Sequence, residues 1–292
     1  MTDHSLSPGQ DAPLKRKKPL GSPPTTMEHS RYRYLYGPVS SWRLGRSLGI
    51  DPLSCPQKTC NFDCVYCQAG RTEVFPSERK VFVPTEALIE EILLLPELSL
   101  DYITFAGNGE PTLASNLGDM IREVRKLRPE KIAVITNASL LGREDVRRDL
   151  LLADLVEAKL DAAAQGPFEN VARPMPGLSV ESIMKSLEMF RSVYGGRLAL
   201  QVMFVMSNRA QATAIATWAC DVKPDEIEVN TPLRDSAVRP LPPGTIADIT
   251  ETFRRICGSR VKVRSVYEVR REASRPFDPG ATERRRGKEN TG

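Results

Sequence analysis

The sequence predicts an α/β fold in which a parallel β-sheet is built from successive βα units. Short β-branched runs alternate with helical stretches through the central part of the 292-residue chain. Residues 132–135 read Ile-Ala-Val-Ile, a continuous apolar run typical of a strand buried on both faces. Several helical stretches follow a serine or threonine, which is where such residues cap a helix. These patterns favour a sheet covered by helices.

The individual elements follow from the same patterns. We expect strands at 47–51, 101–106, 131–136, 155–160, 197–204 and 226–230, with a possible seventh at 261–265. After each expected helix start, apolar residues recur three or four positions apart. The starts are Thr85, Ser115, Ser179 and Thr245. These units are fewer than the eight of a complete TIM barrel, and an open doubly wound sheet and a partial barrel both fit.

The chain is expected to hold one folded domain between two tails. Residues 1–30 mix Ser, Pro, Gly and Lys without apolar periodicity, which predicts disorder. We expect the folded domain at 31–268 and a second disordered, charged tail at 269–292. Basic runs at 15–18 and 284–288 account for much of the net charge of +4. Such runs are usually solvated, although they are compatible with binding nucleic acid.

Composition excludes some classes of protein and site. No stretch approaches the roughly 18 apolar residues of a membrane span, and no signal peptide is evident, so we expect a cytoplasmic protein without membrane contact. The two histidines, His4 and His29, lie in the front segment. A catalytic histidine triad or a histidine-ligated zinc inside the domain is therefore excluded.

Three cysteines follow the first predicted strand within eight residues, in the sequence Cys60-Asn-Phe-Asp-Cys64-Val-Tyr-Cys67. Loops after parallel strands are where such folds place functional groups, and three thiolates can hold an iron–sulfur cluster or zinc. A structural zinc site needs four ligands, usually as two separated pairs. The remaining cysteines are Cys55, Cys220 and Cys257. An auxiliary cluster is conceivable for these three, but burial as small apolar residues is the better interpretation.

Polar groups also follow later strands. Residues 107–111 read Gly-Asn-Gly-Glu-Pro, where Gly107 and Gly109 permit close backbone approach to a ligand and Glu110 supplies an acceptor; a simple tight turn is the alternative. Further polar residues lie at or near the ends of later strands, where sites gather, although capping or surface ion pairs would also explain them. They are Asn137, Lys159, Asp161 and Gln201.

The cysteine spacing C-x-x-x-C-x-x-C, with Tyr66 before the last cysteine, resembles the signature of the radical S-adenosylmethionine superfamily. Gly109-Glu110 is similar to that superfamily's Gly-Gly-Glu element, with Asn108 inserted. The resemblance implies a partial (β/α)6 barrel and a [4Fe–4S] cluster on the three cysteines. It also implies that Glu110 contacts the methionyl amino group of S-adenosylmethionine, with Tyr66 and Asn137 in the cofactor pocket and with Lys159 and Asp161 near the ribose or the methionine carboxylate.

The segment 36–50, together with Asn230-Thr231-Pro232, resembles a small subgroup of radical enzymes labelled wyosine-synthetase-like, although Trp42 stands where their pattern has arginine. The implied activity is hydrogen abstraction from an unidentified substrate, with electrons from an external flavodoxin- or ferredoxin-like donor. A tRNA substrate and a peptide or glycyl-radical protein substrate both stay open, while an electron carrier is disfavoured. Arg43 and Arg46 either pair with carboxylates or lie across the open side of the barrel and contact the substrate.

Overall fold

The computed structural model describes residue 1 and residues 32–76 and 78–286. The expected tail at 2–30 and residues 287–292 of the second tail lie outside the described residues. Within them, eight strands form one sheet in the order of the chain, curled into a half-barrel. The strands are β1 (Leu35–Ser41), β2 (Gly45–Ile50), β3 (Tyr102–Phe105), β4 (Lys131–Thr136), β5 (Leu155–Lys159), β6 (Arg197–Met203), β7 (Glu226–Asn230) and β8 (Lys262–Ser265). This partial barrel settles the choice that the sequence left open.

Strands β2 to β8 are parallel, and each expected strand is present within two residues of its predicted ends. Strand β1 was not predicted; it pairs antiparallel with β2. Its Gly37-Pro38 step interrupts the strand pattern, and proline is tolerated only at strand edges or irregularities. The pairing of β1 with β2 breaks register between Tyr36 and Val39, which is where that step lies.

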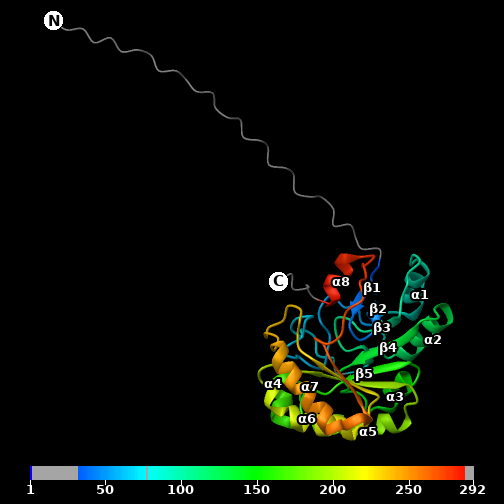
Figure 1. Ribbon diagram of the computed structural model, residues 1–292. Coiled ribbons are helices and arrows are strands. Elements are labelled where there is room, and N and C mark those ends of the chain that lie inside the picture. The colour runs from blue at the N-terminus through cyan, green and yellow to red at the C-terminus, as the bar shows by residue number, and fades with distance from the viewer. Residues whose placement is uncertain (2–31, 77, 287–292) are drawn as a thin grey trace.

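Helices pack around the outside of the half-barrel (Figure 1). They are α1 (Thr85–Leu93), α2 (Leu117–Leu127), α3 (Glu144–Leu150), α4 (Gln165–Ala172), α5 (Val180–Val193), α6 (Ala212–Asp221), α7 (Pro243–Cys257) and α8 (Pro279–Arg286). Of the four expected capping residues, Ser179 caps its helix, accepting from the Ser182 amide at 3.1 Å. Helix α7 begins two residues before Thr245, because Pro243 can occupy a first helical position without a donor. None of the described helices has the length and apolar composition needed to cross a membrane.

The expectation of a disordered tail from residue 269 is wrong for α8 (Figure 1). The Gly37 amide of β1 donates to Thr282 Oγ1 at 3.0 Å, and the Phe277 amide donates to the Gly37 carbonyl at 2.7 Å. Ala281 is fully buried against Tyr36 and Val39. The charged composition of 284–286 hid this helix, because only one face of it packs on β1.

The β1–β2 turn closes the lower end of the half-barrel. Because β2 runs parallel to the strands after it, its preceding turn lies at their amino ends. Leu44 in this turn is buried against Ala133, Leu155 and Ala199, which point into the barrel from three strands. Above Leu44 and its apolar neighbours, the barrel interior contains charged side chains: Glu157 and Glu228 are buried on β5 and β7.

We expect the stability of the protein to depend on pH through Glu228. Burial, reinforced by neighbouring Glu157, raises the pKa of Glu228 well above its usual value. The folded state therefore keeps a proton that the unfolded chain loses near pH 4.3, so this carboxyl costs stability as pH rises. Glu228→Gln cannot ionise, and its melting temperature relative to wild type should increase from pH 5 to pH 8. Thermal unfolding at both pH values measures this, and a pH-independent difference would contradict it.

Candidate active site

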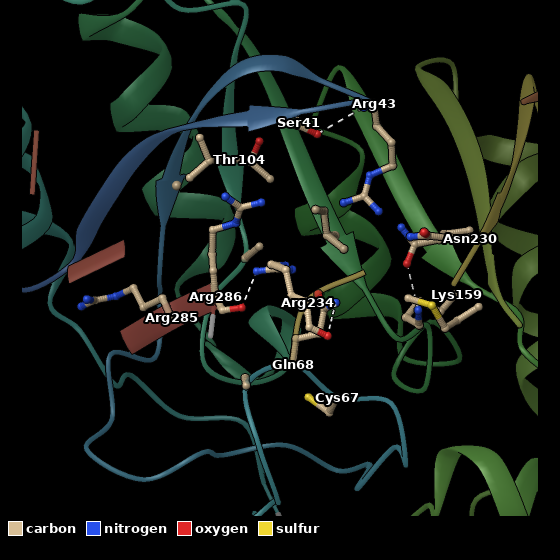
Figure 2. Close-up of a pocket in the computed structure, with 18 of the residues that line it drawn as sticks. Ser41, Arg43, Cys67, Gln68, Thr104, Lys159, Asn230, Arg234, Arg285 and Arg286 are labelled. Carbon is tan, nitrogen blue, oxygen red and sulfur yellow. Dashed lines mark hydrogen bonds between the residues drawn. The ribbon is translucent and has the colours of Figure 1, made fainter. Parts of the chain in front are cut away.

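A cavity of about 300 Å³ lies inside the half-barrel and reaches the carboxyl ends of its strands. Figure 2 shows Arg43 entering it from the β1–β2 turn, with Cys67 at the other end and Lys159 from β5 along one side. The three clustered cysteines line it together with Tyr66, Gly107, Gly109, Glu110, Asn137 and Lys159. The topology thus brings together residues that are far apart in the sequence.

Hydrogen bonds hold the cysteine loop above the strand ends. The Cys60 amide donates to the Val74 carbonyl at 3.1 Å, and the Cys67 amide donates to the Cys64 carbonyl at 3.0 Å, which turns the chain tightly between these two cysteines. Burial raises the pKa of Cys60, and it raises that of Cys64 to about 12, so these thiols are neutral in the metal-free protein. Binding iron would therefore displace their protons.

The donor set suits a cluster better than a single ion. Among the described residues, no three Cys, His, Asp or Glu side chains gather as ligands of one metal ion would. A cubane binds its thiolates at separate corners, and three free cysteines lie on this one loop. Lys58 is buried beside them, and the three sulfurs outweigh burial to raise its pKa. Its positive charge suits an anionic cluster, a contribution that no sequence pattern indicated.

The two glycines of the 107–111 turn allow close packing between loops. A Cβ on Gly109 would lie 1.9 Å from the Thr59 carbonyl oxygen, directly before Cys60, and a Cβ on Gly107 would lie 2.3 Å from Asp51 Cγ. The Glu110 amide donates to the same Thr59 carbonyl at 3.3 Å. Gly109 therefore packs against the cysteine loop and Gly107 against Asp51, while the predicted close approach to a ligand stays a prediction.

Glu110 connects the turn to the next strand end. It is 2% exposed, and its Oε1 accepts from Thr136 Oγ1 at 2.6 Å while its Oε2 accepts from the Asn137 amide at 2.7 Å. Asn137 Nδ2 in turn donates to Asn61 Oδ1 at 2.7 Å and lies 3.7 Å from Cys60 Sγ. Burial raises the pKa of Glu110 although these donors oppose the shift. The network ties both strand ends to the cysteine loop.

Tyr66, Lys159 and Asp161 meet on the opposite side of the cavity. The Tyr66 hydroxyl donates to Asp161 Oδ2, and Lys159 Nζ lies 3.8 Å from the same carboxylate and 4.8 Å from the centre of the Tyr66 ring. Lys159 also donates to Gln201 Oε1 at 2.9 Å, so Gln201 faces the cavity rather than a loop. Asp161 is not among the residues that line the main cavity; its Oδ1 accepts from the Met203 amide at 2.7 Å.

The structure separates the two arginines that the sequence grouped. Arg43 lines the cavity, with its Nε 3.1 Å from Glu157 Oε2 and 3.8 Å from Glu228 Oε2. Arg46 is outside the cavity lining and forms a paired contact with Asp101 at the surface. Both arginines therefore pair with carboxylates, which was one of the two interpretations of the sequence. The β1–β2 turn closes the lower end of the barrel and does not lie across its open side.

Arg43→Met should lower the free energy of unfolding by about 3 kcal/mol or more, because it leaves the buried Glu157 carboxylate without its cation. The matched Arg46→Met variant should lose much less, since that pair is about one-third exposed and solvent screens it. Urea unfolding of both variants measures the difference. Equal losses would mean that the Arg43–Glu157 pair contributes no more to the free energy of unfolding than the Arg46–Asp101 pair.

The outer cysteines do not form a second iron site. Cys220 of α6 and Cys257 of α7 are buried, as expected, but they are bonded to each other as a disulfide with a Cα–Cα distance of 5.4 Å. The sequence interpretation missed this bond because 36 residues separate the two positions and no motif joins them. Cys55 is a free thiol at partial burial, so these three residues do not gather as an auxiliary cluster in the structure.

Comparisons with known proteins identify related sequences. The model of the radical SAM superfamily matches residues 54–209. A UPF0026 protein of Synechocystis sp. is 38% identical over 201 residues, which is 68% of this chain and 76% of that protein. A UPF0026 protein of Methanocaldococcus jannaschii is 37% identical over 246 residues, or 80% of this chain and 75% of that one.

Solved structures show the same fold at low sequence identity. Streptococcus suis SuiB bound to precursor peptide SuiA matches 76% of this chain and 49% of its own, with a TM-score of 0.59 and 13% identity. Archaeal TYW1 matches 72% of each chain, with a TM-score of 0.50 and 15% identity. The similarity to TYW1 is one of fold alone, so the narrower wyosine-synthetase-like subgroup stays a prediction.

Proposed function

This chain belongs to the radical SAM superfamily and to its UPF0026 proteins, and on that premise we propose that it abstracts hydrogen from a substrate held in the half-barrel cavity. It is an enzyme of that superfamily and uses a [4Fe–4S] cluster and S-adenosylmethionine. When bound, these groups supply the electron and the 5′-deoxyadenosyl radical for the abstraction. The observation that supports the proposal is that three free cysteines and Glu110 line one cavity.

The residues of the chain then have distinct roles in the proposal. Cys60, Cys64 and Cys67 hold the cluster, and Lys58 offsets its negative charge. Glu110 accepts from the methionyl amino group while the Thr136 and Asn137 donors keep its carboxylate in place. A carboxylate held by several donors needs little reorganisation when the ligand arrives.

The other wall positions the rest of the cofactor. Lys159 donates to the methionine carboxylate or the ribose, and Tyr66 and Asp161 fix the lysine through their contacts with it. Asp161 acts through its contact with the Tyr66 hydroxyl, and its position near the ribose or the methionine carboxylate stays a prediction. Leu44, packed on Ala133, Leu155 and Ala199, closes the lower end of the cavity.

Reductive cleavage of S-adenosylmethionine tests this proposal. Anaerobically reconstituted protein, reduced with dithionite, should form 5′-deoxyadenosine from S-adenosylmethionine, measured by liquid chromatography. Cluster-loaded, reduced protein that binds S-adenosylmethionine but forms no 5′-deoxyadenosine would overturn it. The same assay with tRNA or a peptide added compares the two substrate classes, because the true substrate should increase turnover.

Enzymes of this superfamily require a one-electron donor. We propose a flavodoxin- or ferredoxin-like protein, since dithionite only replaces such a donor in the assay. Formation of 5′-deoxyadenosine with reduced flavodoxin or reduced ferredoxin would support this choice. If the enzyme is active with dithionite but with neither protein donor, the choice is contradicted.

A further inference from the structure

Three arginines from three separate elements line the same cavity. Arg234 follows β7, Arg271 follows β8, and Arg286 ends α8. Figure 2 shows Arg234 and Arg286 in the middle of the cavity, and Arg285, which also lines it, to one side. Because the three positions are far apart in the chain, their convergence does not reflect a run of solvated charges.

Specific contacts hold these arginines in place. Arg234 Nη1 donates to the Arg286 carbonyl. The neighbouring Arg285 anchors α8, with its Nε 3.4 Å from Asp51 Oδ2 and its Nη2 donating to the Arg33 carbonyl. That anchor, together with the Thr282 contact to β1, fixes the helix end that carries Arg286.

Three further cationic groups of the cavity have partners within the chain. Arg43 pairs with Glu157, Lys159 donates to Gln201, and Arg285 pairs with Asp51. Among the described residues that line the cavity, Glu110 is the one carboxylate, and its oxygens accept from the chain's own donors. Arg271 is exposed.

Three guanidinium groups from separate elements line one cavity, and their convergence favours an anionic occupant. Planar guanidinium groups suit the oxygens of phosphate and carboxylate. We propose that the substrate carries such an anionic group and that Arg234, Arg271 and Arg286 bind it. This inference rests on the proposed function for the identity of the cavity as the substrate site, and it names the chemistry of what the cavity accepts.

The experiment uses full-length, cluster-reconstituted protein saturated with S-adenosylmethionine. Inorganic pyrophosphate and glutarate are titrated calorimetrically at low salt, as probes of a phosphate and of a carboxylate group. Arg234→Met, Arg271→Met and Arg286→Met should each weaken binding of the preferred probe about tenfold or more. Arg239→Met, which changes an exposed arginine in the same loop as Arg234 but outside the cavity lining, is the matched control and should bind as wild type does.

Two further measurements separate the explanations. Arg286→Lys should retain part of the binding, because it keeps the charge and the helix end. Cluster content and S-adenosylmethionine affinity should stay unchanged in all these variants. Preference for pyrophosphate assigns a phosphorylated substrate, and preference for glutarate assigns a carboxylate.

The inference is overturned if wild type binds neither probe, or if Arg239→Met loses as much affinity as the cavity variants. Its failure is distinct from failure of the proposed function. Wild type that binds the probes but does not cleave S-adenosylmethionine would refute the radical mechanism and leave the anion site intact. Wild type that cleaves S-adenosylmethionine but binds neither probe would refute the anion site and leave the radical mechanism intact.

Discussion

Replacing Cys64 with serine is expected to reduce the iron content of reconstituted protein from about four atoms per chain to nearly none. Serine matches the size of cysteine, and the tight turn at Cys64 uses the backbone carbonyl, so the loop can keep its shape. The hydroxyl is a far poorer iron ligand than a thiolate. Formation of 5′-deoxyadenosine should disappear with the cluster, and iron and sulfide analysis with visible absorbance measures the loss.

Cys55→Ser provides the matched control, because Cys55 is a free, partly buried thiol in the same loop outside the cavity lining. This variant should keep its iron and its activity. About eight irons in wild type, falling to about four in the Cys55, Cys220 and Cys257 triple variant, would instead show a second cluster. Loss of iron in Cys55→Ser alone would mean that the ligand set is assigned incorrectly.

Glu110→Gln is expected to weaken S-adenosylmethionine binding at least tenfold while the cluster remains. One side of the carboxylate faces the Thr112 amide at 3.1 Å and the other faces the Asn137 amide at 2.7 Å. In either orientation the glutamine NH₂ meets a backbone N–H, so the variant should also lose about 1–3 kcal/mol of stability. Calorimetric titration of S-adenosylmethionine and urea unfolding measure the two effects.

Glu91→Gln separates the two effects. Glu91 is also buried and accepts from the amides of Arg33 and Tyr34 at 2.6 and 2.9 Å, but it lies outside the cavity. This variant should lose comparable stability and bind S-adenosylmethionine normally. If both variants reduce affinity equally, the Glu110 effect is one of folding and the cofactor assignment fails.

Much of the architecture could be predicted because local pattern and burial agree. Strand β4 is apolar along most of its length because one face packs against helices and the other faces the barrel interior. This apolar composition makes the strand recognisable in the sequence. The cysteine loop was equally evident, because the three thiols lie within eight residues. In both cases the signal is contained in one short segment.

Features that depend on contacts between distant segments could not be predicted. Strand β1 and helix α8 have weak patterns of their own, and each is stabilised by the other across more than 230 residues. The position of Asp161 after β5 predicted a place near the cofactor, and the sequence did not indicate that its carboxylate accepts from the Tyr66 hydroxyl. Sequence proximity places a residue near a site, but the direction of its side chain depends on the neighbours it meets.

The closure of the half-barrel has a consequence for the order of events in turnover. Residues 42–44 block the lower end, and the segment 272–286 covers the edge that β1 would otherwise leave open. In the proposed function, cofactor and substrate therefore share the entrance at the carboxyl ends of the strands. Whichever of the two lies deeper must enter first, and what remains of it must leave last. Steady-state kinetics should accordingly show a compulsory order of binding. The product of the ligand that enters second should leave before the product of the ligand that enters first.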